Sequence, residues 1–256
     1  RGMKMKFVLL IICLFFVRVL PAQKPVTIEC RIGEGIGKIM QLSGVNNGQQ
    51  KILASASYAQ NGYYGFRFIP EYEGFYVLGD GKNHEYPLYL KAGDAVSLFM
   101  DKDTIYLTGK NNTAENKVLY DWVNLSKRVC EKSIFFTRSR STYEDFFPEF
   151  EVLLSKIKPF CKNIETKNSR FNELMKHFIS YELDRFALNF IYTPRSKHPS
   201  KEQRIAYYNS IVDNNKFQDE VILEMPDGIK LLKLYMMFYC LENKKNASDL
   251  QESLAV

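Results

Sequence analysis

The sequence has few of the residues from which metal sites and redox centres are built. It contains five cysteines and three histidines in 256 residues, and no two cysteines form a Cys-x-x-Cys motif. His84, His177 and His198 lie far apart, so no two of them have the spacing of metal ligands on one helix. Neither a Gly-x-Ser-x-Gly nor a His-Glu-x-x-His motif occurs. The sequence therefore predicts no catalytic residue, no metal site and no cofactor.

Charge of one sign accumulates nowhere in the chain. There are 35 Lys and Arg residues against 29 Asp and Glu residues. Four of the basic residues and none of the acidic ones lie in the first 22 positions, which leaves 31 basic and 29 acidic side chains in the rest. No run of five like charges occurs. We therefore expect that nucleic acid is not a partner.

A long apolar run occurs only near the start of the chain. A basic stretch precedes an apolar segment at 7–19, and Leu20-Pro21-Ala22 follow it. This order of features predicts a signal peptide at 1–22. The segment is shorter than the roughly 20 residues of a membrane-spanning helix, and Arg18 interrupts it. We expect an exported protein, periplasmic or associated with the cell envelope, with no stable membrane span after cleavage.

Glycine is confined mostly to one third of the chain, and this third is where β structure is expected. Of the 14 glycines, 12 lie between Gly33 and Gly109. Apolar and polar residues alternate between these turns, as they do in half-buried strands. Strands are predicted at 25–32, 38–42, 50–58, 64–69, 75–78, 86–90, 95–100 and 104–107. Eight strands are enough for two packed sheets, so residues 23–112 are predicted to form an antiparallel β-sandwich.

After Asn112 the apolar residues recur every three or four positions, which indicates helices. Six helices are expected, with starts at Thr113, Ser141 or Thr142, Ser169, Ser200, Gln218 and Gly228. The fourth, over 201–212, begins with a pattern that resembles a capping box, and Pro159 is expected to kink or end the second. The predicted class is therefore α+β, with an all-helical domain or linker region at 113–256.

Aromatic residues are plentiful, with 16 Tyr and 19 Phe. A cluster in the β region is a candidate binding face for a peptide, a glycan or an envelope protein, and it consists of Tyr63, Tyr64, Phe66, Tyr72 and Tyr76. Core packing is the competing explanation for the same cluster.

Four cysteines remain after the predicted signal peptide, namely Cys30, Cys130, Cys161 and Cys240. They can be buried thiols, or they can form one or two disulfides, for which four cysteines allow three pairings. None lies at the predicted start of a helix or beside a second cysteine, where a thiolate would be stabilised. We therefore expect no redox activity from these residues.

The β region resembles a known family. The resemblance rests on GYYGFRF at 62–68, EGFYVL at 73–78, YLKAGDAVSLFM at 89–100 and IYLTGKNNTAEN at 105–116. These segments are similar to the β domain of unknown function that precedes a TlpA-like thioredoxin domain in secreted proteins of Gram-negative anaerobes. Ala92 stands where proline is common in that family.

The resemblance implies that the chain is the noncatalytic N-terminal region of an exported thiol-disulfide oxidoreductase. Its role would be to position a substrate or partner for a thioredoxin-like domain, and the chain is expected to be truncated before that domain. The alternative is a stand-alone periplasmic binding or envelope-assembly module that recognises peptide, glycan or protein through its aromatic β face.

Overall fold

The computed structural model describes residues 24–57, 62–81, 84–134, 140–211, 217 and 220–242. The predicted signal peptide at 1–22 lies outside the described residues. Within them, the chain forms eight strands in two four-stranded sheets, followed by five α-helices and two short 3-10 helices. The α+β class and the order of strands before helices are therefore confirmed.

The strands form two sheets of four. The first sheet has the order β4-β1-β7-β8, made of β4 (Tyr63–Phe68), β1 (Val26–Ile32), β7 (Ala95–Met100) and β8 (Ile105–Leu107). The second has the order β3-β2-β5-β6, made of β3 (Gln49–Ser57), β2 (Ile39–Asn46), β5 (Gly74–Gly79) and β6 (Glu85–Leu90).

One pair of strands departs from the expected antiparallel arrangement. β1 and β7 are parallel, whereas the other neighbouring pairs are antiparallel. The sequence between β1 and β7 passes through the four strands of the second sheet and through β4 before it returns. A long crossover of this kind can bring the chain back in its original direction, which a hairpin cannot do.

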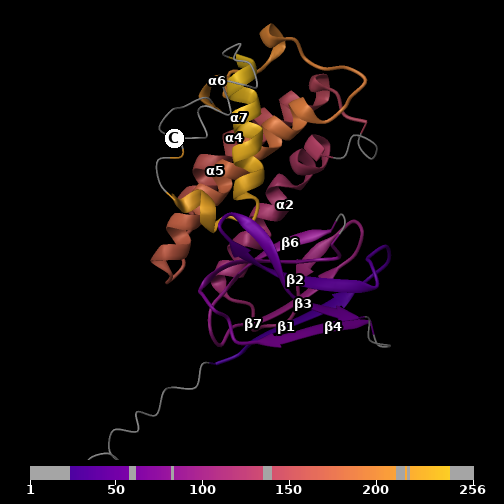
Figure 1. The fold of residues 1–256 in the computed structure, drawn as a ribbon, viewed down its shortest axis with the longest axis vertical. Helices are drawn as coiled ribbons and strands as arrows, with labels where there is room; N and C mark the ends of the chain where they lie inside the picture. The colour runs from indigo at the N-terminus through magenta and orange to yellow at the C-terminus, as the bar shows by residue number, and fades with distance from the viewer. Residues whose placement is uncertain are drawn as a thin grey trace, which may run out of the picture.

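The helices lie over one face of the second sheet, and the first sheet lies against its other face (Figure 1). β5 is consequently buried at all six positions. Phe75 faces the helices, with its ring 5.0 Å from that of Phe178, whereas Tyr76 belongs to the core between the sheets. A strand covered on both faces is expected to be apolar throughout, as GFYVLG is.

The helices agree in part with the expectation. The α-helices are α2 (Ala114–Ile134), α4 (Tyr143–Lys162), α5 (Ser169–Tyr192), α6 (Tyr207–Ile211) and α7 (Gly228–Glu242), and the 3-10 helices are η1 (Lys201–Gln203) and η2 (Glu220–Glu224). The fourth predicted helix is thus divided into η1 and α6, because Arg204 has an extended backbone at ψ 141°. Of the fifth predicted helix, the described residues form the 3-10 helix η2, and α4 continues for three residues past Pro159.

Candidate functional site

A cleft of about 530 Å³ lies between the helices and the second sheet. Its walls come from α2, α5, and the segment from η2 to α7, and its base comes from β5, β6 and the turn between β7 and β8. The volume lies in the range of about 300–1,000 Å³ that is typical of small-ligand sites. We call this cavity the interlayer cleft.

Two glycines hold one wall of the interlayer cleft against the sheet. Gly48, in the tight turn between β2 and β3, donates its backbone N–H to the carbonyl of Leu223 at 2.6 Å, and its own carbonyl accepts from Ile229 at 3.0 Å. A Cβ atom on Gly228 would lie 1.9 Å from the carbonyl oxygen of Ile222 and 3.2 Å from the Cα of Gly48. Only glycine allows this close approach, which fixes the start of α7 on the hairpin.

The long wall of the cleft is one face of α5. Phe178, Glu182, Arg185, Phe186 and Asn189 line it, and their spacing of three and four residues places them on the same side of a helix. Phe178 and Phe186 are buried, and the polar residues Glu182, Arg185 and Asn189 lie on the same helix face. The wall therefore combines apolar surface with charge.

Arg185 is the centre of the charged part of the cleft. Its Nε and Nη2 atoms each donate to a carboxylate oxygen of Glu182 at 2.8 Å, and its Nε lies 4.0 Å from Asp227. Burial alone would lower the pKa of Arg185, but the two carboxylates outweigh burial and raise it. Arg185 is therefore a fixed cation that is already paired in a bidentate manner.

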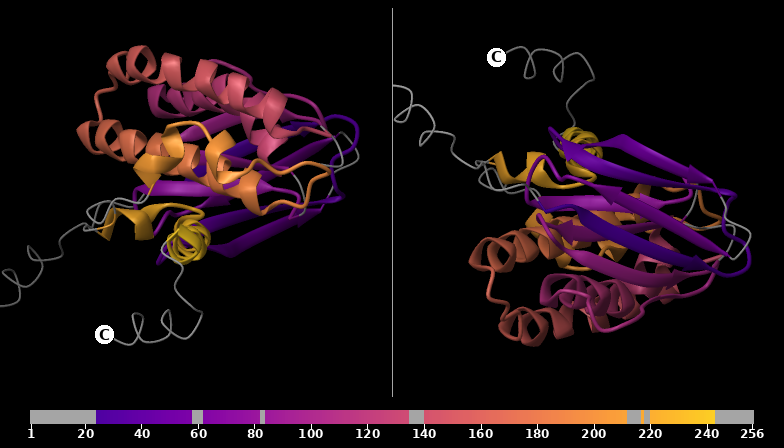
Figure 2. Two further views of the ribbon diagram at one scale, coloured as in Figure 1. Left: turned by 90° about the horizontal axis from the view of Figure 1, so that it is seen from above. Right: turned by 90° about the horizontal axis from the view of Figure 1, so that it is seen from below.

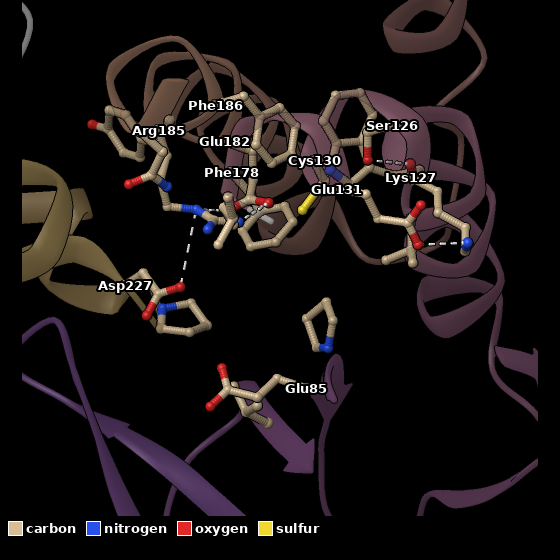
Figure 3. Close-up of a pocket in the computed structure, with 18 of the residues that line it drawn as sticks. Glu85, Ser126, Lys127, Cys130, Glu131, Phe178, Glu182, Arg185, Phe186 and Asp227 are labelled. Carbon is tan, nitrogen blue, oxygen red and sulfur yellow. Dashed lines mark hydrogen bonds and ion pairs between the residues drawn. The ribbon is translucent and has the colours of Figure 1, made fainter. Parts of the chain in front are cut away.

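Asp227 connects this pair to the sheet. Gln50, on β3, donates from Nε2 to Asp227 at 3.4 Å and to Glu85 at 3.1 Å. Burial raises the pKa of Asp227, but Arg185 and Lys230 outweigh it and hold the pKa below its ordinary value of 3.8. Figure 3 shows Glu85 across the cavity from Arg185 and Cys130, with Asp227 on one side and the Lys127–Glu131 pair on the other.

The cleft lining has more carboxylates than cations. The acidic residues that line it are Glu85, Asp101, Asp103, Glu131, Glu182 and Asp227. The Lys and Arg residues that line it are Lys102, Lys127, Arg185 and Lys230. With six carboxylates against four cations among the described residues, the site favours a ligand that carries positive charge.

Two ring nitrogens in the cleft lining have no hydrogen-bond partner among the described residues. One is the indole N–H of Trp122, a side chain that is 1% exposed. The other is Nε2 of His84, whose Nδ1 lies 2.9 Å from a carboxylate oxygen of Asp80. A buried donor without a partner costs about 1–3 kcal/mol. Trp122 lines the cleft, but its N–H is covered by protein, so an acceptor on a ligand reaches it only if neighbouring side chains move.

The four described cysteines are free thiols, and burial disfavours the thiolate form of Cys30, Cys130 and Cys161. Burial raises the pKa of Cys30 to about 12 and that of Cys130 to about 11, the latter against the opposing effect of Arg185. Burial also raises the pKa of Cys161, and Cys240 is buried. Of the two sequence-based alternatives, the structure shows buried or half-buried thiols and no disulfide between these four residues. Cys130 lines the cleft, yet it lacks the thiolate character of a redox centre.

The structure does not bring the predicted aromatic face together. Tyr64, Phe66 and Tyr76 are core residues between the sheets, whereas Tyr63 is 43% exposed on the outer side of the first sheet. Tyr72 stacks on Tyr76, with ring centroids 4.8 Å apart, and hydrogen-bonds to the backbone. Neighbouring residues of a strand point to opposite faces, so closeness in sequence was misleading here.

One part of the cleft has a recognisable signal in the sequence, and another part has none. Glu182 and Arg185 interrupt the apolar face of α5. Opposite charges three residues apart on such a face indicate a partly buried ion pair. Asp227 and Glu85 reach the cleft through the tertiary fold, which no local pattern reveals.

No known family model matches the chain, and no curated protein matches it significantly. Among the helices of the described residues, none combines the length and apolar character that a membrane crossing needs.

Proposed function

We propose that this chain is a noncatalytic binding module, a β-sandwich with a helical cover, and that the interlayer cleft binds an extended peptide segment. The parent protein in this proposal is an exported thiol-disulfide oxidoreductase, and the bound segment belongs to its substrate or partner. The observation that carries the proposal is a cleft of ligand-binding size whose lining combines apolar side chains with more carboxylates than cations.

A peptide satisfies the chemistry of the cleft. One of its apolar side chains can pack on the part of the cleft lined by Phe178 and Phe186. A Lys or Arg side chain complements the excess of carboxylates, to which Glu85 and Asp227 contribute. The bound segment is therefore a peptide with neighbouring apolar and basic residues.

The raised pKa values of the cysteines support a noncatalytic role. Efficient disulfide exchange needs a thiolate near neutral pH, and burial works against this at Cys30 and Cys130. The alternative of a stand-alone envelope module uses the same cleft. The two differ in whether a thioredoxin-like domain acts on the bound segment.

Trp122 provides a direct readout because it is the single tryptophan in the sequence. We expect acetyl-Phe-Lys-Leu-amide to change its emission in a saturable manner, and the same peptide with Glu in place of Lys to bind more weakly. The double variant Glu85→Gln, Asp227→Asn should weaken the first peptide roughly tenfold, since each exposed charge pair contributes up to about 1 kcal/mol.

A matched control is Glu151→Gln, which removes a charge from the exposed side of α4 and should leave binding unchanged. Equal affinity for the Lys and Glu peptides, or an emission that neither peptide changes up to millimolar concentration, would count against the proposal.

A further inference from the structure

The outer face of the first sheet carries a shallow groove of about 150 Å³, separate from the interlayer cleft. This face points away from the second sheet and the helices (Figure 2, right). The groove lies over all four strands of the first sheet, and its lining residues other than Leu98 alternate with the core residues of those strands.

One row of side chains crosses the sheet at a single level. Tyr63 on β4 is the cross-strand neighbour of Arg31 on β1, and Arg31 is the neighbour of Phe99 on β7. Phe99 is in turn the neighbour of Tyr106 on β8. Adjacent strands are about 4.8 Å apart, so the row from Tyr63 to Tyr106 extends about 14 Å. We call it the aromatic row.

The rings of the aromatic row are presented to solvent. Tyr63 and Tyr106 are each 43% exposed. Phe99 and Tyr106 stack with their centroids 4.8 Å apart and their planes within 22°, which gives a nearly flat platform. Exposed aromatic side chains that gather on one face commonly mark an interaction site.

A second, polar row runs beside the aromatic row. Glu29 pairs across the strands with Gly65 on one side and Ser97 on the other, and Thr108 donates its backbone N–H to Ser97 at 2.7 Å. The side of Gly65 is open, because the nearest atom to an added Cβ would be the Ile28 carbonyl oxygen at 3.9 Å. Hydroxyl, carboxylate and guanidinium groups therefore lie next to the rings.

The charge of the groove is balanced. It contains one carboxylate, Glu29, and one guanidinium, Arg31, and both side chains are exposed. A phosphate or a strongly basic ligand would meet repulsion from one of them. Strand addition by a peptide occurs at the edge of a sheet, whereas this groove lies on the face of the sheet.

We propose that this groove binds a neutral glycan, with sugar rings lying on the aromatic rings of the aromatic row and their hydroxyls hydrogen-bonded to Arg31 in that row and to the polar row beside it. The C–H groups on one face of a sugar carry partial positive charge and pack on the negative face of an aromatic ring. Glu29 accepts hydrogen bonds from sugar hydroxyls, and Arg31 donates to them. A shallow groove suits a flat ring better than a bulky apolar side chain, which needs a deeper pocket.

The test uses the whole chain on an array of neutral and acidic glycans, followed by calorimetry with the neutral glycan that is retained most strongly. Tyr106→Ala and Tyr63→Ala should each weaken binding roughly three- to tenfold, the range expected for one aromatic contact. Tyr106→Phe keeps the ring and should retain most of the affinity. Glu29→Gln should weaken binding through the polar row.

Ile52→Ala serves as the control, because Ile52 is 56% exposed on β3 of the other sheet. It should leave binding unchanged, and thermal unfolding checks that each variant is folded. Trp122 emission should not respond to the glycan, which separates this groove from the interlayer cleft. The inference is overturned if no neutral glycan is retained or if only acidic glycans bind. It is also overturned if the Tyr63→Ala, Tyr106→Ala double variant binds the glycan as tightly as the unsubstituted chain does.

Discussion

The side-chain amide of Asn116 pairs with the backbone of Tyr89 through two hydrogen bonds. Its oxygen accepts from the Tyr89 N–H at 3.0 Å, and its nitrogen donates to the Tyr89 carbonyl at 2.8 Å. β6 lies at the edge of the second sheet, so the amide takes the place of a neighbouring strand. Asn112 makes the same pair of bonds to Ser97 in the first sheet, each at 3.0 Å. The connection to α2 is thus attached to both sheets.

Replacing Asn116 with Ala should destabilise the protein by about 2–4 kcal/mol. The substitution leaves the N–H and the carbonyl of Tyr89 buried without partners, and each such group costs about 1–3 kcal/mol. Urea unfolding measures the difference. Lys117→Ala changes the next, exposed residue of α2 and should stay within about 0.5 kcal/mol. Equal losses for both variants would show that the amide pair contributes little.

Gly228→Ala should lower the free energy of unfolding more than an alanine substitution at a glycine that has positive φ but free space around it. The new Cβ would meet the Ile222 carbonyl oxygen at 1.9 Å, and relief requires the start of α7 to move from the β2–β3 hairpin. We expect a loss of more than about 3 kcal/mol. Gly62→Ala is the comparison, because Gly62 has φ +78° and no atom within 4 Å, so only backbone strain of about 1–2 kcal/mol applies. The reverse order of the two losses would contradict the described contact.

Asp227 should contribute to the loss of stability in acid. Its pKa is lower in the folded protein than the ordinary 3.8, so its contribution is fully present above that value and is lost as the pH falls through the folded-state pKa. Asp227→Asn should therefore lower stability at neutral pH and reduce the further loss between about pH 5 and pH 2. Urea midpoints across this range test it. If Asp227→Asn loses as much stability in acid as the unsubstituted chain does, Asp227 does not have this role.

Cys130 should react slowly with iodoacetamide near neutral pH. Its pKa is raised from 9.0 to about 11 by burial, which lowers the thiolate fraction about a hundredfold. The alkylation rate, followed by mass spectrometry of the Cys130 peptide, should rise steeply between about pH 8 and pH 11. Cys130→Ser should alter stability at most, and insulin-reducing turnover that disappears in this variant would contradict a noncatalytic role.

The strands were predictable from sequence because their turns carry strong local signals. Asn47 and Gly48 have φ of 48° and 70°, which is the conformation that Asn-Gly favours in a two-residue hairpin turn. The burial of individual side chains was harder to predict. Tyr63 and Tyr64 are adjacent and both aromatic, yet one is exposed and the other lies in the core.

The interlayer cleft could not be predicted from sequence, since its parts are brought together only by packing. Gln50 and Asp227 are 177 positions apart and meet at 3.4 Å. The capping box at Ser200 was predicted correctly, but it caps a single 3-10 turn, which ends where the backbone of Arg204 becomes extended. Local patterns predict where an element starts more reliably than how far it continues.

The most direct test of cleft binding is the indole N–H resonance of Trp122 in a proton–nitrogen NMR spectrum, which contains one such signal because the chain has one tryptophan. Binding of acetyl-Phe-Lys-Leu-amide in the interlayer cleft should move this signal in a saturable manner, because Trp122 lines the cleft. The Glu85→Gln, Asp227→Asn variant should need roughly tenfold more peptide for the same shift. If the peptide shifts backbone amides elsewhere while the Trp122 signal stays in place, the cleft is not its binding site.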